Sequence, residues 1–210
     1  MKNRFADLKN KLKQPKTWIA AAIVAVLLAV IAILIASASK TPEKSGVEAK
    51  IEQRIIQKSD HTYDGELIEE VRFITVHYTA NPGSTAIANR NYFNGLADGH
   101  GVSASAHFIV GLDGEIIQCV PLECVSWANG NMDSNRHSIT IECCHPTEDG
   151  HFSEATLSSL RELVAWLCEK YSVGRDGIIR HYDVTGKDCP RYFVAHPDEW
   201  EAFNDSVFEK

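Results

Sequence analysis

The chain has 210 residues and a formal net charge of −7, and this length is enough for about one ordinary domain and an appendage. Its positive charge is concentrated in residues 1–17, which hold six Lys and Arg and a single acid, Asp7. The remainder has 15 Lys and Arg against 27 Asp and Glu, a formal charge of −12. Because binding to a polyphosphate needs a basic face, nucleic acid is excluded as the expected partner.

Residues 18–36, "WIAAAIVAVLLAVIAILIA", form an apolar run without a charge. A helix of this length spans roughly 28 Å, close to the thickness of the hydrocarbon core of a membrane. We expect a transmembrane anchor over residues 18–38, with the basic tail, 1–17, in the cytoplasm and the rest of the chain extracellular. The alternative is secretion after cleavage near Ala38, because Ala36-Ser37-Ala38 has the small-x-small form of a signal cleavage site. Both alternatives predict that the folded part is exported.

Residues 39–60 are mostly polar and small, which is typical of a tether, and they place the start of the folded domain at residue 61. Residues 71–76, "VRFITV", are β-branched and aromatic and predict a strand that ends at His77-Tyr78-Thr79. A helix is expected over residues 84–96, with Ser84 as its N-cap and with apolar residues at helical spacing, namely Ile87, Tyr92 and Leu96.

Two further strands are expected over residues 104–110 and 115–120, separated by "GLDG", a hairpin signal. The stretch "SWANGNMDSNRHS", residues 126–138, is rich in Asn, Ser and Gly and predicts a surface loop. Residues 138–143 alternate as a strand does, so that Ile139 and Ile141 face one side while Thr140 and Glu142 face the other.

The last elements are helical. Residues 153–171 predict a helix with an apolar stripe at Leu157, Leu160, Val164, Leu167 and Cys168, and residues 198–208 predict a short closing helix. Strands interspersed with helices indicate an α/β domain, in which a mixed central sheet is flanked by helices.

The six cysteines, at positions 119, 124, 143, 144, 168 and 189, show no repeated CxxC pattern. Cys119 and Cys124 are the pair that could meet across a turn. Strain disfavours a vicinal disulfide between Cys143 and Cys144. If Cys189 binds a metal ion, at least one of the other five is unpaired within the chain.

Two histidines and a cysteine lie where strands end and loops begin. His77 follows a predicted strand, and His181 and Cys189 bracket a Thr-Gly turn signal in "RHYDVTGKDCPRYF", residues 180–193, which could fold both side chains onto one ion. A ligand set of His, His and Cys leaves a tetrahedral zinc ion with one open position. Without further evidence, a histidine at a strand end is more often an ordinary polar residue, and a free cysteine a small buried one.

Four blocks of the sequence resemble, in order, the zinc-dependent N-acetylmuramoyl-L-alanine amidases of type 2. This family is related to the peptidoglycan recognition proteins and the phage T7-like lysozyme amidases. The blocks are "VHYTAN" at 76–81, "SAHFIVGLDGEIIQCVP" at 105–121, "SITIE" at 138–142 and the pattern H-x5-K-x-C-P at 181–190. The resemblance covers residues 71–203 and implies the mixed α/β fold of that family.

The resemblance implies roles for five side chains: zinc ligands at His77, His181 and Cys189, a general base at Glu142, and an oxyanion-stabilising cation at Lys187. The implied reaction is hydrolysis of the amide between the lactyl group of N-acetylmuramic acid and the L-alanine of the peptidoglycan stem peptide. The residue types suit these roles, because a carboxylate can accept a proton from water and a cation stabilises a developing oxyanion.

One position departs from several relatives. Those relatives have a tyrosine before the histidine of the "HF" strand, whereas this chain has Ala106. The "SAH" version resembles a bacterial branch that uses a glutamate instead, so the assignment of the base depends on Glu142. From sequence alone, Glu142 faces either a cleft or solvent, and Lys187 is otherwise a solvated loop lysine.

Four more side chains are candidates for contact with substrate: His107, Trp127, Asn129 and His137. Trp127 and Asn129, with the neighbouring Asn131, suit a groove for a sugar or a peptide, although an ordinary surface loop has the same composition. His107 and His137 are alternatively structural residues that touch no substrate.

Two other functions stay open at this point. One is a receptor domain that binds peptidoglycan without cutting it, and the other is a zinc peptidase that cuts within the stem. Some relatives that bind without cutting lack the cysteine ligand, so Cys189 favours an enzyme. We therefore expect a bacterial, membrane-anchored zinc amidase that acts on peptidoglycan outside the cytoplasmic membrane.

Overall fold

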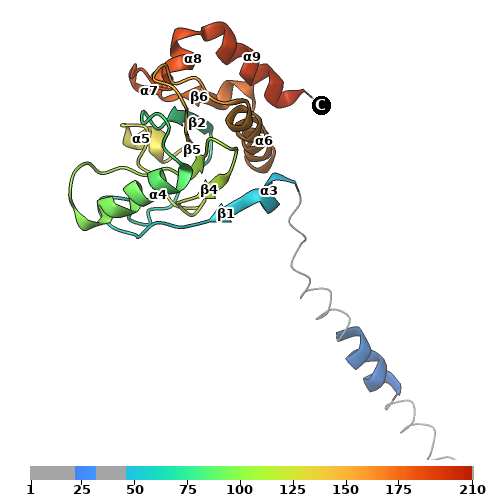
Figure 1. Cartoon of the computed structure of the whole chain (residues 1–210). Helices are drawn as coiled ribbons and strands as arrows, with labels where there is room; N and C mark the ends of the chain where they lie inside the picture. Colours follow the sequence, from blue (N-terminus) through green and yellow to red (C-terminus); the bar gives the residue numbers. More distant parts are fainter. Residues whose placement is uncertain (1–21, 32–45, 210) are drawn as a thin grey trace, which may run out of the picture. The chain divides into compact units, whose positions relative to one another are not determined.

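The computed structural model describes residues 22–31 and 46–209 (Figure 1). Residues 22–31 are helical and exposed. Within these two segments, no helix is both long enough and apolar enough to cross a membrane. The basic tail, 1–17, and the other residues of the anchor predicted over 18–38 lie outside the described residues, as does the first part of the predicted tether.

A six-stranded sheet forms the centre of the second segment, with the strand order β1-β4-β3-β5-β2-β6. The β3–β4 pair is antiparallel and the other four neighbouring pairs are parallel, which confirms the predicted mixed sheet. The antiparallel pair is the hairpin predicted at "GLDG". The strands are β1 (Ile51–Gln53), β2 (Phe73–Tyr78), β3 (Phe108–Val110), β4 (Ile116–Gln118), β5 (Ser138–Cys143) and β6 (Ile178–Arg180).

Helices flank this sheet, as predicted. The longest is α6 (Glu154–Tyr171), which begins after Ser153, whose hydroxyl accepts a hydrogen bond from the Thr156 N–H. The others are α3 (Val47–Lys50), α4 (Ala86–Gly95), α5 (Met132–Asn135), α7 (His181–Thr185), α8 (Arg191–Ala195) and α9 (Pro197–Phe208), with short 3-10 turns η1 (Leu96–Asp98) and η2 (Arg175–Gly177).

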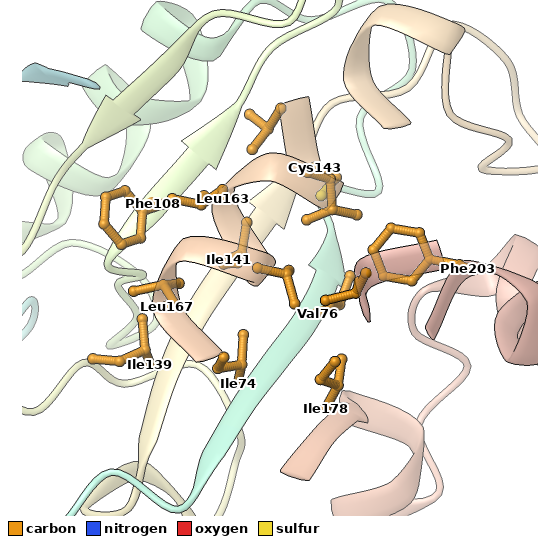
Figure 2. Packing of buried hydrophobic residues seen from close by; sticks show 14 of the residues in the cluster. Ile74, Val76, Phe108, Ile139, Ile141, Cys143, Leu163, Leu167, Ile178 and Phe203 are labelled. Carbon is orange, nitrogen blue, oxygen red and sulfur yellow. The ribbon is translucent and has the colours of Figure 1, made fainter. Parts of the chain in front are cut away.

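The sheet has a different apolar cluster on each face. On one face, Leu163 and Leu167 of α6 and Phe203 of α9 pack against alternate residues of the central strands, among them Ile74, Val76, Phe108, Ile139 and Ile141 (Figure 2). On the other face, Phe93 of α4 and Leu96 pack with Ile109 and Ile117. Strand side chains alternate between the two faces, so the residues adjacent in sequence to those that pack on α6 point to the α4 face. His77 and Glu142 are among these residues.

The predicted tether over 39–60 is wrong for its C-terminal part. Residues 51–53 form β1, which pairs in parallel with β4 so that Ile51 lies opposite Ile116. Beyond the strand, Ile56 is buried and its N–H donates to the Cys119 carbonyl. These residues therefore belong to the domain, which begins before residue 61. A strand of three residues is too short to give a periodic signal in the sequence.

Helix α4 differs in detail from its prediction over 84–96. Its N-cap is Thr85 and not Ser84, because the Thr85 hydroxyl accepts from the Ala88 N–H. Its buried face contains Asn89 and Phe93, whereas Tyr92 is 57% exposed. Tyr92 therefore does not belong to the core-facing stripe, and it is free to line a surface pocket.

All six cysteines lie in the described part of the chain, and all are buried and free. The Cys119–Cys124 disulfide considered from the sequence is therefore not present. Cys119 is fully buried beside β4, and burial raises the pKa of its thiol to about 12. The thiolate needed for exchange chemistry is disfavoured at such a site.

Candidate metal centre

His77, His181 and Cys189 come together at one end of the sheet. Each offers one ligand atom, and these atoms lie within 4.8 Å of one another. His77 is near the C-terminal end of β2, and His181 directly follows β6, the parallel neighbour of β2. Since Val76 is in register with Arg180, the next residue of each chain segment brings the two histidines side by side, with their ring centroids 4.7 Å apart.

A tight turn brings Cys189 back to the same point. Helix α7 ends at Gly186, whose φ of 75° is readily adopted by glycine and reverses the chain. The Tyr182 N–H then donates to the Cys189 carbonyl at 2.9 Å, which ties the turn to the helix. The Cys189 Sγ lies 3.7 Å from the Nδ1 of His77. The Thr-Gly turn expected from the sequence thus brings the side chains of His181 and Cys189 together, as inferred.

The three side chains are buried, and burial favours their neutral forms. It lowers the pKa of His77 to about 3, helped by the neighbouring His181, and it also lowers the pKa of His181. Burial raises the pKa of Cys189 to about 12, with a further contribution from Glu142. Two neutral imidazoles are ready to bind a metal ion, and a cation would offset the cost of ionising the thiol. This donor set fits a divalent transition metal held with an open coordination position.

Glu142 faces this centre. Its strand, β5, is the other parallel neighbour of β2, and Glu142 is directly in register with His77. Its Oε2 is buried and has no hydrogen-bond partner among the described residues. Burial raises the pKa of Glu142 to about 8, against the opposing effect of the Lys187 charge. The sequence left two orientations for Glu142, toward a cleft or toward solvent, and the structure has the first of them.

A pocket of about 210 Å³ opens onto the centre. Lys187, which is exposed, lies in its wall together with the three metal-binding side chains and Glu142. The other lining residues come from the end of β2, from α4 and from the loops before β3 and α5, and they are Tyr78, Thr79, Ala80, Asn89, Tyr92, Phe93, Ala104, Ser105, Trp127 and Ala128. The pocket therefore combines a metal centre, a carboxyl group and a cation with an aromatic wall.

Of the predicted substrate contacts, Trp127 lies in the pocket wall. Sequence reasoning missed Asn89, Tyr92 and Phe93, which lie there on α4. The sequence did contain a signal for these three residues: their i, i+3, i+4 spacing puts them on one face of a helix that follows His77 closely in the sequence. Ala106, at the position of the family's tyrosine, is fully buried and contributes no functional group to the pocket.

His107 does not contact the pocket. It is fully buried, and the Thr140 N–H donates to its Nδ1 at 3.0 Å. The proton is therefore on Nε2, which donates to the Cys124 carbonyl at 2.9 Å. Burial lowers the pKa of His107 to about 4, which favours this neutral form. Both ring nitrogens are used inside the core, so the predicted substrate contact is wrong and the role is structural.

His137 is also remote from the centre. It precedes β5 at the end opposite Glu142, a separation of roughly 16 Å along a strand that rises about 3.3 Å per residue. Its Nδ1–H donates to the Asp133 carbonyl at 2.8 Å, and its Nε2 lies 3.5 Å from Glu69. Its predicted contact with substrate is wrong as well.

The two asparagines of the 126–138 loop have different positions. Asn129 is fully buried, and its Oδ1 lies 3.0 Å from the Nε2 of His77. Asn131 is exposed and caps α5, where its side chain accepts from the Ser134 N–H. Neither lines the pocket, so their predicted contact with substrate is wrong, and Asn129 instead touches a metal-binding residue.

The sequence and the fold both match known proteins. The family model described as N-acetylmuramoyl-L-alanine amidase matches residues 68–192, which is more than half of the chain. The chain belongs to the N-acetylmuramoyl-L-alanine amidase family. The match contains His77, Glu142, His181 and Cys189, so the metal centre and the buried carboxylate lie within the amidase region.

Individual members of the amidase family agree with this assignment. A probable N-acetylmuramoyl-L-alanine amidase of Bacillus licheniformis is 32% identical over 168 residues, which cover 75% of this chain and 47% of the relative. A mutant endolysin from Bacillus subtilis has a similar structure, with a TM-score of 0.64 and 30% identity over 75% of this chain and 97% of the other. PlyL has a TM-score of 0.66 and 26% identity over 76% and 97%. The chain spans about half the length of the curated relatives that it matches.

Proposed function

We propose that this protein is a zinc-dependent N-acetylmuramoyl-L-alanine amidase that cleaves peptidoglycan between N-acetylmuramic acid and L-alanine. The observation that carries the proposal is the cluster of His77, His181 and Cys189 with Glu142 in register beside it, whose buried Oε2 has no partner in the described part of the chain. Family membership gives the substrate class, and the donor set of two imidazoles and one thiol fits zinc with a position left open.

A bound zinc ion would supply Lewis acidity, which lowers the pKa of water, polarises the scissile carbonyl and favours ionisation of nearby acids. Glu142 accepts a proton from the attacking water, a role supported by its place beside His77 and by its Oε2, which has no hydrogen-bond partner among the described residues. Lys187, in the same pocket, stabilises the negative charge that develops on the carbonyl oxygen. Glu142 then returns the proton to the amine of L-alanine as the C–N bond breaks.

The test is incubation of the full-length protein with purified peptidoglycan, with and without a chelator, followed by mass analysis of the released peptides. We expect intact stem peptides that begin with L-alanine, new amino termini and no new reducing ends. The chelator should abolish release and added zinc should restore it. Tight binding without release would instead indicate a receptor domain, and cleavage within the stem would indicate a peptidase.

We also propose that residues 18–38 anchor the protein in the cytoplasmic membrane, with the amidase domain outside. The uncharged run from Trp18 to Ala36 and the basic residues before it support this placement. The full-length chain should then stay in the membrane fraction after a salt wash. Recovery of a soluble chain that begins near Ser39 would show cleavage of a signal peptide instead.

A further inference from the structure

We propose that Asn129 is the positioning residue of the metal centre: its side-chain oxygen orients His77 and its backbone orients His181, so that both rings present Nδ1 to the ion. The inference rests on the proposed zinc site, and it assigns a role to a loop residue that is 52 positions from His77 in the sequence. Metal-binding histidines generally need such a partner on the other ring nitrogen, because it fixes both the tautomer and the orientation of the ring.

The side chain of Asn129 is held on all sides. It is fully buried, and its backbone N–H donates to the Asn135 Oδ1 at 2.9 Å. Its Nδ2 faces three hydroxyl oxygens, those of Ser134 at 2.8 Å, Ser138 at 3.1 Å and Thr75 at 3.4 Å. Two of these hydroxyls belong to the central strands β2 and β5, so the rigid sheet fixes the amide in place.

The hydrogen bonds determine which end of the amide faces His77. The Ser138 hydroxyl donates its only proton to the Ser134 carbonyl at 2.7 Å, so its oxygen can only accept from Asn129. The NH₂ end must therefore face Ser138, and Oδ1 faces the His77 Nε2 at 3.0 Å. It follows that Nε2 carries the proton of neutral His77. The Nδ1 lone pair is left toward the Cys189 Sγ, 3.7 Å away.

The second histidine is held by the same short segment. The ring of His181 lies near the backbone of Asn129. Its Nε2 lies 3.7 Å from the point where a side chain at Gly130 would begin, so this edge of the ring faces residues 129 and 130. The other ring nitrogen, Nδ1, is then the one left for the metal centre. One segment of the loop therefore orients both imidazoles.

Loss of the amide should weaken the metal centre. In Asn129→Ala, the buried Nε2–H of His77 has no acceptor, and the ring is free to turn or to move its proton to Nδ1, which blocks the ligand atom. We expect zinc affinity to fall by about 10- to 100-fold, the usual loss when the partner of a metal-binding histidine is removed. Asn129→Asp retains an acceptor for Nε2–H and should recover most of that loss.

The measurement is the zinc affinity of the full-length protein by competition with a chromogenic chelator. The matched control is Asn131→Ala, because this asparagine lies in the same loop and caps α5 without touching either histidine. A thermal unfolding curve for each variant checks that the domain is folded. Equal affinity in Asn129→Ala and the unchanged protein would overturn the inference, and so would an equal loss in Asn131→Ala.

A second readout needs no metal. The ¹⁵N shifts of the His77 ring in the zinc-free protein should show the Nε2–H tautomer, and Asn129→Ala should show a mixture of tautomers. A purely structural role of Asn129 would leave the tautomer unchanged, which would contradict the inference. Because this test uses zinc-free protein, it decides the role of Asn129 separately from the proposed function. If the unchanged protein failed to bind zinc, that result would refute the proposed function alone.

Discussion

Glu142→Gln should lower the rate of stem-peptide release by roughly 10²- to 10⁴-fold, the range expected when general-base catalysis is lost. Zinc content should stay unchanged, because Glu142 is not among the three side chains that converge as ligands. Glutamine has nearly the same shape and cannot accept the proton. The measurement combines the initial rate on purified peptidoglycan with the zinc content of the dialysed protein.

The matched control for this variant is Glu169→Gln, which makes the same chemical change at an exposed position on α6. It should keep both the rate and the zinc content. A near-normal rate in Glu142→Gln would contradict the assignment of the base. His107 could not take over the role, because both its nitrogens are engaged inside the core.

Cys189→Ser should release the metal ion. The change replaces the one soft ligand by a hydroxyl that stays protonated, while the two histidines keep their positions. Removal of a residue that only supports a ligand typically costs up to about 100-fold in metal affinity, so we expect removal of the ligand itself to cost more than about 100-fold. Zinc content after dialysis and the affinity from chelator competition measure the effect, and turnover should be lost in parallel.

Cys168→Ser is the corresponding control, since Cys168 is also buried and free but lies on α6 in the apolar cluster. It should lower the free energy of unfolding without releasing zinc. Unchanged zinc retention in Cys189→Ser would remove this residue from the ligand set. It would leave two histidines, fewer than the three protein ligands that a catalytic zinc site usually has.

The sequence was most informative where the pattern is long or strongly periodic. The strand predicted over 138–143 has those bounds in β5, and the helix predicted over 153–171 is α6 with Ser153 as its cap. The strand predicted from residue 71 with its end at 77–79 is β2, which begins at Phe73 and ends at Tyr78, where its ladder with β5 also ends. The short strand β1 gave no signal, and its pairing with β4 depends on a contact distant in sequence.

The sequence by itself determined the residue types and the order of the metal-binding set, because His77, His181 and Cys189 follow strand and turn signals that are local. Only the tertiary structure decided which neighbours act on that set. The register of β2 with β5 brings Glu142 beside His77, and the path of a loop brings Asn129 behind it. The same contacts place His107 in the core. Local patterns specify which face of an element a side chain occupies. Strand register and the path of a loop are instead fixed by packing between distant segments. A single sequence carries no periodic signal for either of these.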